Sequence, residues 1–367
     1  MSKEIKRVVL LFLIILFLCP YHPAAQTENI SSFSGKVTDA KTGEALPGVN
    51  VYIAGSSVGS STDEAGNYSF RTSLTGNHSI VFSMLGYGFE ARAITMSSGG
   101  SYVIDAKMEP VTIQLQEVEV ISSNKEWRGN FEYFRNQFIG VTEFADETKI
   151  ANSWVLSFEL EKNILSAYAN QPLIVINRAL GYEIHIELVR FEWDINTNLG
   201  IYKVYYHFED LQAKDKQQHK KWLRNRIETF LGSKNHFFRS LYRGDWRENH
   251  YSISDNDNLY SLSNKDLKYY FLTATSPIYK KPEGWQVFKL ENLVKIKYYQ
   301  KLTYEIENEE FTVELDKVSG IKSGTPDKIF LVNKWGFLKD IESVRLYGIW
   351  GINRIANSLP NNFTYTP

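Results

Sequence analysis

The chain has 367 residues, of which 43% are hydrophobic and 14% aromatic, so it is long enough for two or three domains with sizeable cores. Its formal net charge of −1 at pH 7 argues against a protein that binds nucleic acid through bulk charge. The single cysteine, Cys19, falls in the expected leader, which excludes disulfides and cysteine-ligated metals from the mature chain.

Residues 1–25 have the pattern of a secretory signal peptide, with basic residues followed by an apolar run. The run Val8–Leu18 is too short to span a membrane comfortably. Small residues favour cleavage after Ala25. Lipidation at Cys19 is the alternative, which Leu18 disfavours because lipoprotein signals need a small residue before the cysteine. We therefore expect an exported protein, periplasmic or associated with the outer membrane, with no transmembrane helix in the mature chain.

A polar lead-in at 26–32 is followed by alternating apolar and polar residues over 33–108. Val49, Val51 and Ile53 alternate with other side chains, and this period of two indicates strands with one buried face. Turn patterns that contain glycine or proline, such as DAKTG, LPG and DEAG, separate the runs. Short strands with turns every ~8–12 residues are typical of a β-sandwich.

The motifs GKVTD, LPGVNVYI and DEAGNYSF, followed by a break at Leu85–Tyr87, resemble the carboxypeptidase regulatory-like domain over roughly Phe33–Met108. The resemblance covers less than a third of the chain. It implies a seven-stranded, transthyretin-like Greek-key sandwich. It also implies a structural or binding module of the kind found beside carboxypeptidases and at the front of TonB-dependent outer-membrane receptors, without catalytic residues.

Residues 109–124 are expected to form a linker or strand. The stretch Val111–Ser123 resembles the segment that follows this domain in TonB-dependent receptors and contacts the energy-coupling protein. A docking strand is one interpretation, and a last sandwich strand with a linker is the other. We favour the second, because the residues that remain are too few for a 22-stranded barrel whose strands need ~10 residues each.

Residues 125–367 read as a second, larger α+β domain in which strands dominate, so the chain as a whole is expected to be mainly β. β-branched and aromatic residues are concentrated in the predicted strands. These strands are Trp154–Leu160, Pro172–Arg178, Glu183–Trp193, Gly200–Phe208, Tyr269–Ala274, Val294–Tyr304, Glu310–Leu315 and Asp327–Leu331.

The apolar spacing predicts a helix at about Asp215–Leu231. A second helix is expected to start after Ser233 as N-cap and to end at Gly244. The tail Gly336–Pro360 is expected to form a last hairpin and a short helical turn.

The sequence offers no catalytic, cofactor-binding or metal-ligating motif. A zinc carboxypeptidase needs a histidine with glutamate three residues later, and none of the seven histidines has one. His185 and His207 have Glu187 and Glu209 two residues on, which on a strand indicates a polar face rather than a metal site. The G-x-S-x-G nucleophile motif and the P-loop are absent as well. We therefore expect a protein that is not an enzyme and has no cofactor.

Two charged stretches have an ordinary explanation. Asp255–Asn258 resembles a calcium loop but lacks its glycine and its last glutamate, so a polar turn is expected. The basic surface Lys216–Arg226 could meet lipid or nucleic-acid phosphates, but a solvated helix face is the more economical interpretation.

All eight tryptophans follow residue 125, and exposed rings can stack on sugars or anchor a protein. Trp246 and Trp285 are the candidate contacts, because each adjoins a glycine or a charged loop. The first functional hypothesis is a cell-envelope protein whose sandwich binds a protein partner at the outer membrane. A glycan-binding accessory protein that uses these aromatic residues, a TonB-linked receptor component and an unknown enzyme in 125–367 are the alternatives.

Overall fold

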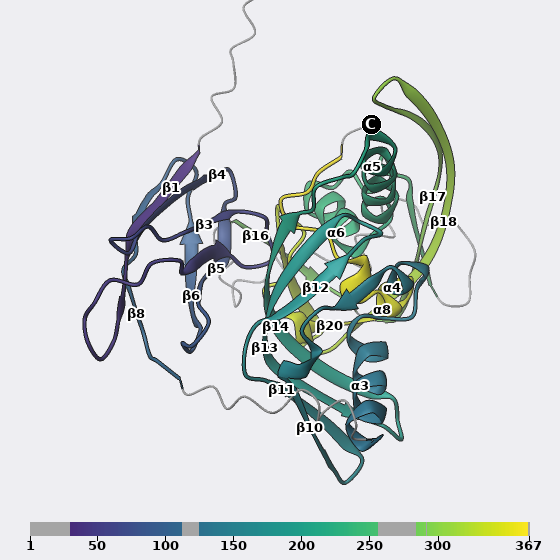
Figure 1. The fold of residues 1–367 in the computed structure, drawn as a ribbon. Helices are drawn as coiled ribbons and strands as arrows, with labels where there is room; N and C mark the ends of the chain where they lie inside the picture. The colour runs from purple at the N-terminus through teal and green to yellow at the C-terminus, as the bar shows by residue number, and fades with distance from the viewer. Residues whose placement is uncertain (1–29, 112–124, 256–283, 291, 366–367) are drawn as a thin grey trace, which may run out of the picture.

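The computed structural model describes residues 30–111, 125–255, 284–290 and 292–365. This part of the chain is mainly β, as predicted: a sandwich lies beside a larger α+β region that is rich in strands (Figure 1). Several expectations fall wholly or largely outside the described residues: the signal peptide 1–25, the segment Val111–Ser123, the strand Tyr269–Ala274 and the loop Asp255–Asn258.

Two sheets form the sandwich, with the orders β4-β1-β7 and β3-β2-β5-β6. β7 and β8 run parallel to successive halves of β1 and together form one interrupted strand. Counted in this way, the described sandwich has the seven strands that the resemblance implies. The strands are β1 (Ser31–Asp39), β2 (Asn50–Ile53), β3 (Gly59–Ser61), β4 (Asn67–Thr72), β5 (Gly76–Ser83), β6 (Glu90–Met96), β7 (Ser101–Val103) and β8 (Ala106–Met108).

The apolar positions of the sandwich point inward, as their alternation predicts. Val49, Val51 and Ile53 are fully buried and pack in one core with Phe33 and Phe82. The first strand begins two residues earlier than expected, inside the segment assigned to the polar lead-in, because Ser31 and Ser32 pair with the end of β4.

The long strand β13 (Tyr182–Asp194) is the centre of the first sheet of the second region. β14 (Leu199–Asp210) pairs along one side of it, while β12 and β11 pair with successive parts of the other side. Helix α3 (Lys125–Phe138) covers one face, where Phe134 and Phe138 are buried. The remaining elements are α4 (Glu143–Asp146), β9 (Thr148–Ile150), β10 (Leu156–Glu161), β11 (Ile164–Ala169) and β12 (Leu173–Asn177).

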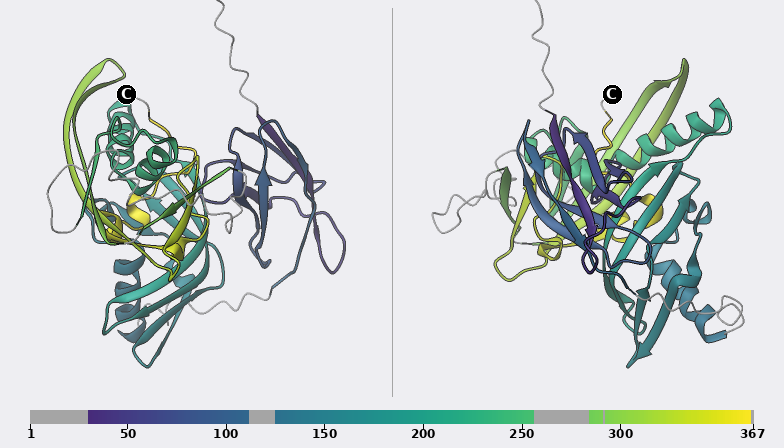
Figure 2. Two further views of the ribbon diagram at one scale, coloured as in Figure 1. Left: turned by 180° about the vertical axis from the view of Figure 1, so that it is seen from behind. Right: turned by 60° about the vertical axis from the view of Figure 1, so that its left-hand side comes forward.

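A second sheet has the order β15-β17-β18-β20, and β16 pairs with β19 beside it. Its long hairpin, β17 with β18, curves around α5 (Figures 1 and 2). The elements are α5 (Lys216–Phe230), α6 (Lys234–Arg243), β15 (Tyr251–Asp255), β16 (Trp285–Lys289), β17 (Val294–Ile306), β18 (Glu309–Ser323), β19 (Ile329–Asn333), β20 (Val344–Gly348) and α8 (Ile349–Ile352).

The two helices expected from their end signals are present. Asp215 caps α5 by accepting from the Gln218 N–H at 2.8 Å, and Ser233 caps α6 by accepting from the His236 N–H at 3.1 Å. Gly244 ends α6 in the left-handed conformation, with φ of 81°.

One expectation for the second region was wrong, and one element, the helix α3, had not been predicted. The tail forms no hairpin of its own, because its strand β20 pairs with β18, which lies well before the tail in the sequence. The first part of the tail makes only an isolated bridge, between Leu338 and Val332. The short helical turn expected in the tail is α8.

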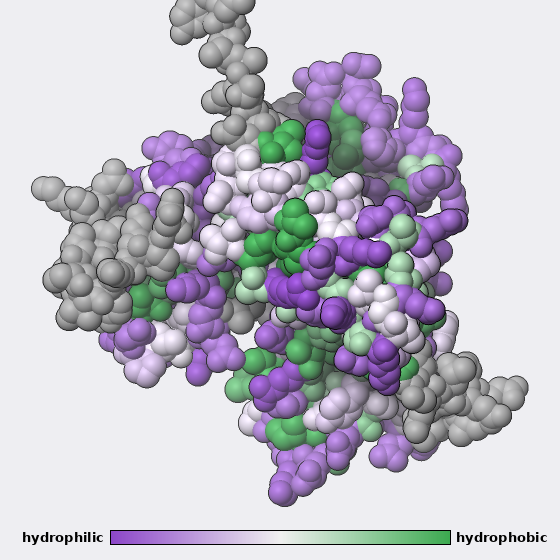
Figure 3. All heavy atoms as spheres, turned by 90° about the vertical axis from the view of Figure 1, so that its left-hand side faces the viewer, coloured by the Kyte–Doolittle hydropathy of each residue, from purple (hydrophilic) through white to green (hydrophobic). Residues whose placement is uncertain are grey.

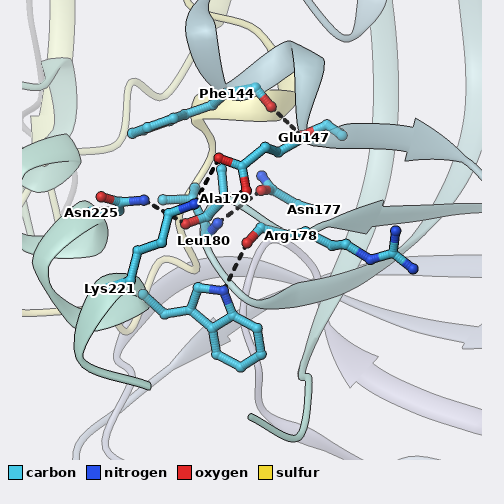
Figure 4. A network of polar contacts seen from close by, with 10 residues as sticks. Phe144, Glu147, Asn177, Arg178, Ala179, Leu180, Lys221 and Asn225 are labelled. Atoms are coloured by element: carbon cyan, nitrogen blue, oxygen red, sulfur yellow. Dashed lines mark hydrogen bonds and ion pairs between the residues drawn. The ribbon is translucent and has the colours of Figure 1, made fainter. Parts of the chain in front are cut away.

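A polar network fastens α5 to the turn between β12 and β13 (Figure 4). The indole N–H of Trp222 donates to the Arg178 carbonyl at 2.7 Å, and the Asn225 amide donates to the Ala179 carbonyl at 2.8 Å. At the surface, Lys221 pairs with Glu147 at 2.9 Å. These contacts hold α5, around which the second sheet curves, against the first sheet. The two sheets therefore form one structural unit, called the framework below.

The sandwich joins this framework through the edge of β14. Backbone bonds connect Gly55 N–H to the Tyr206 carbonyl at 2.6 Å and Phe208 N–H to the Ser56 carbonyl at 3.0 Å. The sheet with β2 and β5 therefore faces the second region, and the sheet with β1 and β4 faces outward (Figures 1 and 2).

Candidate functional site

A cavity of about 580 Å³ lies between β14, the corner where α5 meets α6, and the C-terminal segment 353–363. This volume falls in the range of ~300–1,000 Å³ that is usual for small-molecule sites. Five aromatic rings line it, one or more from each wall: Tyr202, Tyr206, Phe230, Trp350 and Phe363.

Two phenols face the cavity from one side of β14. Tyr202 and Tyr206 are four residues apart, so the alternation of the strand places them on the same face. Neither hydroxyl forms a hydrogen bond within the described residues. Burial raises the pKa of Tyr202, and it raises that of Tyr206 to about 12. Both phenols therefore stay protonated at neutral pH and can donate to a ligand.

Two guanidinium groups hold the C-terminal segment in place. Arg239, which is 5% exposed, donates to the carbonyls of Trp335, Asn361 and Phe363 at 2.8–2.9 Å. Burial lowers its pKa to about 10, so it remains charged. Arg354 likewise donates to carbonyls, among them that of Gln137 at 3.0 Å. In both cases the hydrogen bonds go to neutral acceptors, so the positive charges are not cancelled by carboxylates.

Lys234 is the first residue of α6 and borders the cavity. Its side chain is exposed to solvent, and its ammonium has no hydrogen bond or ion pair within the part of the chain that the structure describes. Protein surrounds it closely enough that burial, and then the charge of Arg354, lowers the pKa of the ammonium. The N–H groups of Lys234 and Asn235, at the start of the helix, have no partner within α6.

The charges that line the cavity are predominantly positive. The lining contains five cationic side chains and two carboxylates, and the Asp340 carboxylate already accepts a hydrogen bond from the Glu342 N–H at 2.9 Å. The charged lining residues are Lys203, Lys234, Arg239, Lys339 and Arg354, with Asp340 and Glu342.

The histidine and glutamate pairs of β13 and β14 lie at the junction with the sandwich, not at this cavity. His185 and His207 are cross-strand neighbours, and the Tyr52 ring of the sandwich lies 5.0 Å from the His207 ring. Glu187 is buried and accepts from the Ser83 hydroxyl. Burial lowers the pKa of His207 and raises that of Glu187. No group of three potential metal ligands occurs among the described residues.

The two tryptophans chosen from the sequence are not exposed contacts. Trp246 is 8% exposed and belongs to the core of the second region. Trp285 is 3% exposed; it borders a groove between the sandwich and the second region, but its ring is packed against protein. The expectation that they present rings to a partner or glycan is therefore wrong. The sequence did not single out Tyr202, Tyr206 and Lys234.

The basic face of α5 is largely neutralised. Lys220 pairs with Glu309 at 2.6 Å, Lys221 with Glu147, and Arg226 with Asp210 at 2.7 Å. These pairs fit the solvated helix face that we expected. The helices in the described segments are too short or too polar to span a lipid bilayer.

Residues 33–120 match the family model of the CarboxypepD_reg-like domain, so this part of the chain is a domain of that family. The match confirms the resemblance seen in the motifs, and it extends twelve residues beyond the expected end of the sandwich at 108. The family assignment concerns the sandwich and leaves the second region, with its cavity, outside it.

A stretch of 120 residues is 28% identical to part of TonB-dependent receptor P3 from Formosa agariphila. It amounts to 33% of this chain and 11% of the receptor, so the chain spans only a small part of the length of that relative.

Two solved structures cover most of the chain at low similarity. A proposed carbohydrate binding protein from Bacteroides uniformis is 9% identical, with 78% of this chain and 99% of that one covered and a TM-score of 0.19. A proposed membrane-associated protein of unknown function from Bacteroides fragilis is 9% identical, with 87% and 99% covered and a TM-score of 0.18. TM-scores this low support no argument about the present chain.

Proposed function

We propose that this chain is a non-enzymatic binding protein of the bacterial cell envelope and that its second region binds a small hydroxyl-rich ligand, such as a glycan unit, in the cavity beside β14. The observation that carries the proposal is the lining: Tyr202, Tyr206 and Lys234 offer donors that no described protein group uses. Aromatic rings and a few convergent polar groups are the usual composition of a ligand site.

The envelope location is part of the same proposal. It is supported by the pattern of a signal peptide in residues 1–25 and by the similarity of the sandwich to part of a TonB-dependent receptor. The sandwich then serves as an attachment module, and the second region carries the ligand.

Binding is tested by calorimetry with a panel of mono- and disaccharides and a variant that fills the cavity. Val204 lies between the two tyrosines on β14 and lines the cavity, so Val204→Trp should abolish binding. Val189→Trp is the matched control, because Val189 is 40% exposed on neighbouring β13 and outside the cavity lining. Retention of full affinity in Val204→Trp, or a wild-type protein that binds no member of the panel, would contradict the proposal.

The tyrosine hydroxyls are tested separately. Tyr202→Phe together with Tyr206→Phe keeps both rings and removes both donors. Two lost hydrogen bonds of ~0.5–1.5 kcal/mol each should weaken binding by about tenfold or more. An unchanged affinity would show that the hydroxyls do not contact the ligand.

A second candidate function, binding of an envelope protein by the sandwich, is favoured by the outward edge of β4. In the described part of the sandwich, β4 pairs with β1 on one side and with no strand on the other. The hydrophobic residues on this side of the molecule form small, separate patches (Figure 3), so a partner strand at this edge is a better fit than an apolar contact. A TonB-linked receptor is the candidate partner.

A photo-cross-linking residue at Ser69 on β4, compared with one at exposed Glu159 on β10, tests this candidate in the native envelope. One reproducible protein adduct from position 69 alone supports it. The same background from both positions contradicts it.

A further inference from the structure

We propose that the ligand of the cavity is an acidic sugar, with a carboxylate that binds at Lys234 and the N-terminus of α6. This inference rests on the ligand-binding function proposed above and names its ligand class. It is carried by one ammonium without a described partner at a cavity whose lining also holds a surplus of positive charge.

The surplus of charge favours an anion over a neutral ligand. The lining holds five cationic and two anionic side chains, and Arg239 and Arg354 have their hydrogen bonds directed to carbonyl groups. Inside a cavity, screening by water is weaker than at the open surface, so these charges attract a bound anion more strongly than isolated surface charges do.

Lys234 marks the position of the anionic group within the cavity. Each nitrogen of the Arg239 guanidinium already donates to a carbonyl, whereas the Lys234 ammonium has no described partner. Lys234 and Asn235, whose N–H groups begin this ten-residue helix, both line the cavity, and the helix dipole adds to the attraction. One ammonium with two neighbouring amides suits a single carboxylate.

The rest of the lining fits a hydroxylated ring. The phenols of Tyr202 and Tyr206 can donate to hydroxyl oxygens, and the partly exposed Phe363 ring offers an apolar surface on which a sugar ring can pack. Thr229 also lines the cavity, and its hydroxyl has no partner within the described residues. Together these groups recognise a ring with hydroxyls on one side and a carboxylate on the other.

The experiment compares matched sugars that differ only at the acid group: glucose with glucuronate, galactose with galacturonate and mannose with mannuronate. Calorimetry on the full mature chain should show binding of at least one acid about tenfold or more tighter than its neutral partner. Acetate at the same concentration should not displace that acid, because it lacks the ring.

Lys234→Met keeps the apolar stem and removes the charge. It should lower the affinity for the acid about tenfold or more and lower the affinity for the neutral sugar by clearly less, because the neutral sugar has no carboxylate with which to lose an ion pair. Lys216→Met is the matched control, because Lys216 is likewise the first residue of a capped helix but lies outside the cavity.

The outcomes separate this inference from the function on which it rests. If neutral sugars bind as tightly as acids, or Lys234→Met has no selective effect, the acidic class is wrong and sugar binding stands. If acetate displaces the acid completely, the cavity recognises an anion without the ring. If no sugar of either series binds, both the inference and the proposed function fail.

Discussion

His236 is a buried histidine whose ring is fully engaged in the second region. The Gly232 N–H donates to its Nδ1 at 3.2 Å, so Nε2 carries the proton and donates to Asn249 Oδ1, also at 3.2 Å. The Tyr251 hydroxyl lies 3.0 Å from Nδ1 as well. Burial lowers the pKa of this ring to about 4. The neutral ring is therefore part of the folded structure.

Stability should fall in acid because of this residue. Since the folded pKa lies below the unfolded value of ~6.5, the contribution is complete above pH 6.5 and is lost as the pH falls toward about 4. The loss should be on the order of 3 kcal/mol. Urea unfolding between pH 7 and 4 measures it. His236→Gln should flatten this dependence, while His219→Gln, at an exposed ion pair with Glu307, should keep it. If the free energy of unfolding depends on pH equally in both variants, His236 is not the source of the acid sensitivity.

Glu187, at the junction with the sandwich, should make stability depend on pH in the opposite direction to His236. Burial raises the pKa of its carboxyl, so its protonated form suits the folded state and its stabilising contribution is lost as the pH rises through the folded pKa. Glu187→Gln still accepts from Ser83 and removes the buried charge. We expect the variant to gain more in melting temperature at pH 8 than at pH 5. A gain that is larger at pH 5 would contradict this account.

At the scale of elements, the buried bond between Asn225 and Ala179 should matter more than the surface ion pair beside it. Asn225→Ala leaves the buried Ala179 carbonyl without its donor and should cost about 1–3 kcal/mol. Lys221→Ala breaks a pair in which the lysine side chain is 51% exposed and should cost about 0–1 kcal/mol. Chemical unfolding of the two variants checks the order, and equal costs would show that the network does not fasten α5.

The elements that could be predicted from the sequence are those with local end signals or a clean period. α5 and α6 follow from Asp215, Ser233 and Gly244, which act on the few residues next to them. α3 was missed although Phe131, Phe134 and Phe138 have helical spacing, because its aromatic residues also favour strands and Gly129 interrupts it. Local sequence signals thus predict a secondary-structure element when they agree, and the prediction fails when they conflict.

The candidate site could not be predicted, because its walls come from segments that only the tertiary fold brings together. The alternation that places Tyr202 and Tyr206 on one face is visible in the sequence, but whether that face meets α6 or solvent is not. The same limit explains the error at Trp246 and Trp285. Glycine and charged neighbours suggested exposure, whereas packing between distant strands buries both rings.

At the scale of the whole molecule, the sandwich and the second region share main-chain hydrogen bonds as well as side-chain contacts. The loop at Gly55 donates to the Tyr206 carbonyl and accepts from the Asn361 N–H at 2.7 Å. Trp335 reaches across to the Thr75 carbonyl at 2.8 Å. Tyr206 and the segment near Asn361 also line the cavity. The interface with the sandwich and the candidate site therefore share the same segments of the second region.

The whole chain should therefore unfold as one unit, and Gly55 should control that coupling. A Cβ at Gly55 would lie 2.3 Å from Nδ2 of the Asn361 side chain, and φ is 76° there. Gly55→Val should displace the segment at Asn361 and split the single calorimetric transition into two. Gly43→Val is the matched control: φ is 74°, nothing lies within 4 Å, and only a backbone cost of ~1–2 kcal/mol is expected, which lowers one transition without dividing it. Two transitions in the wild type, or the same response in both variants, would mean that the sandwich folds independently of the region that it covers.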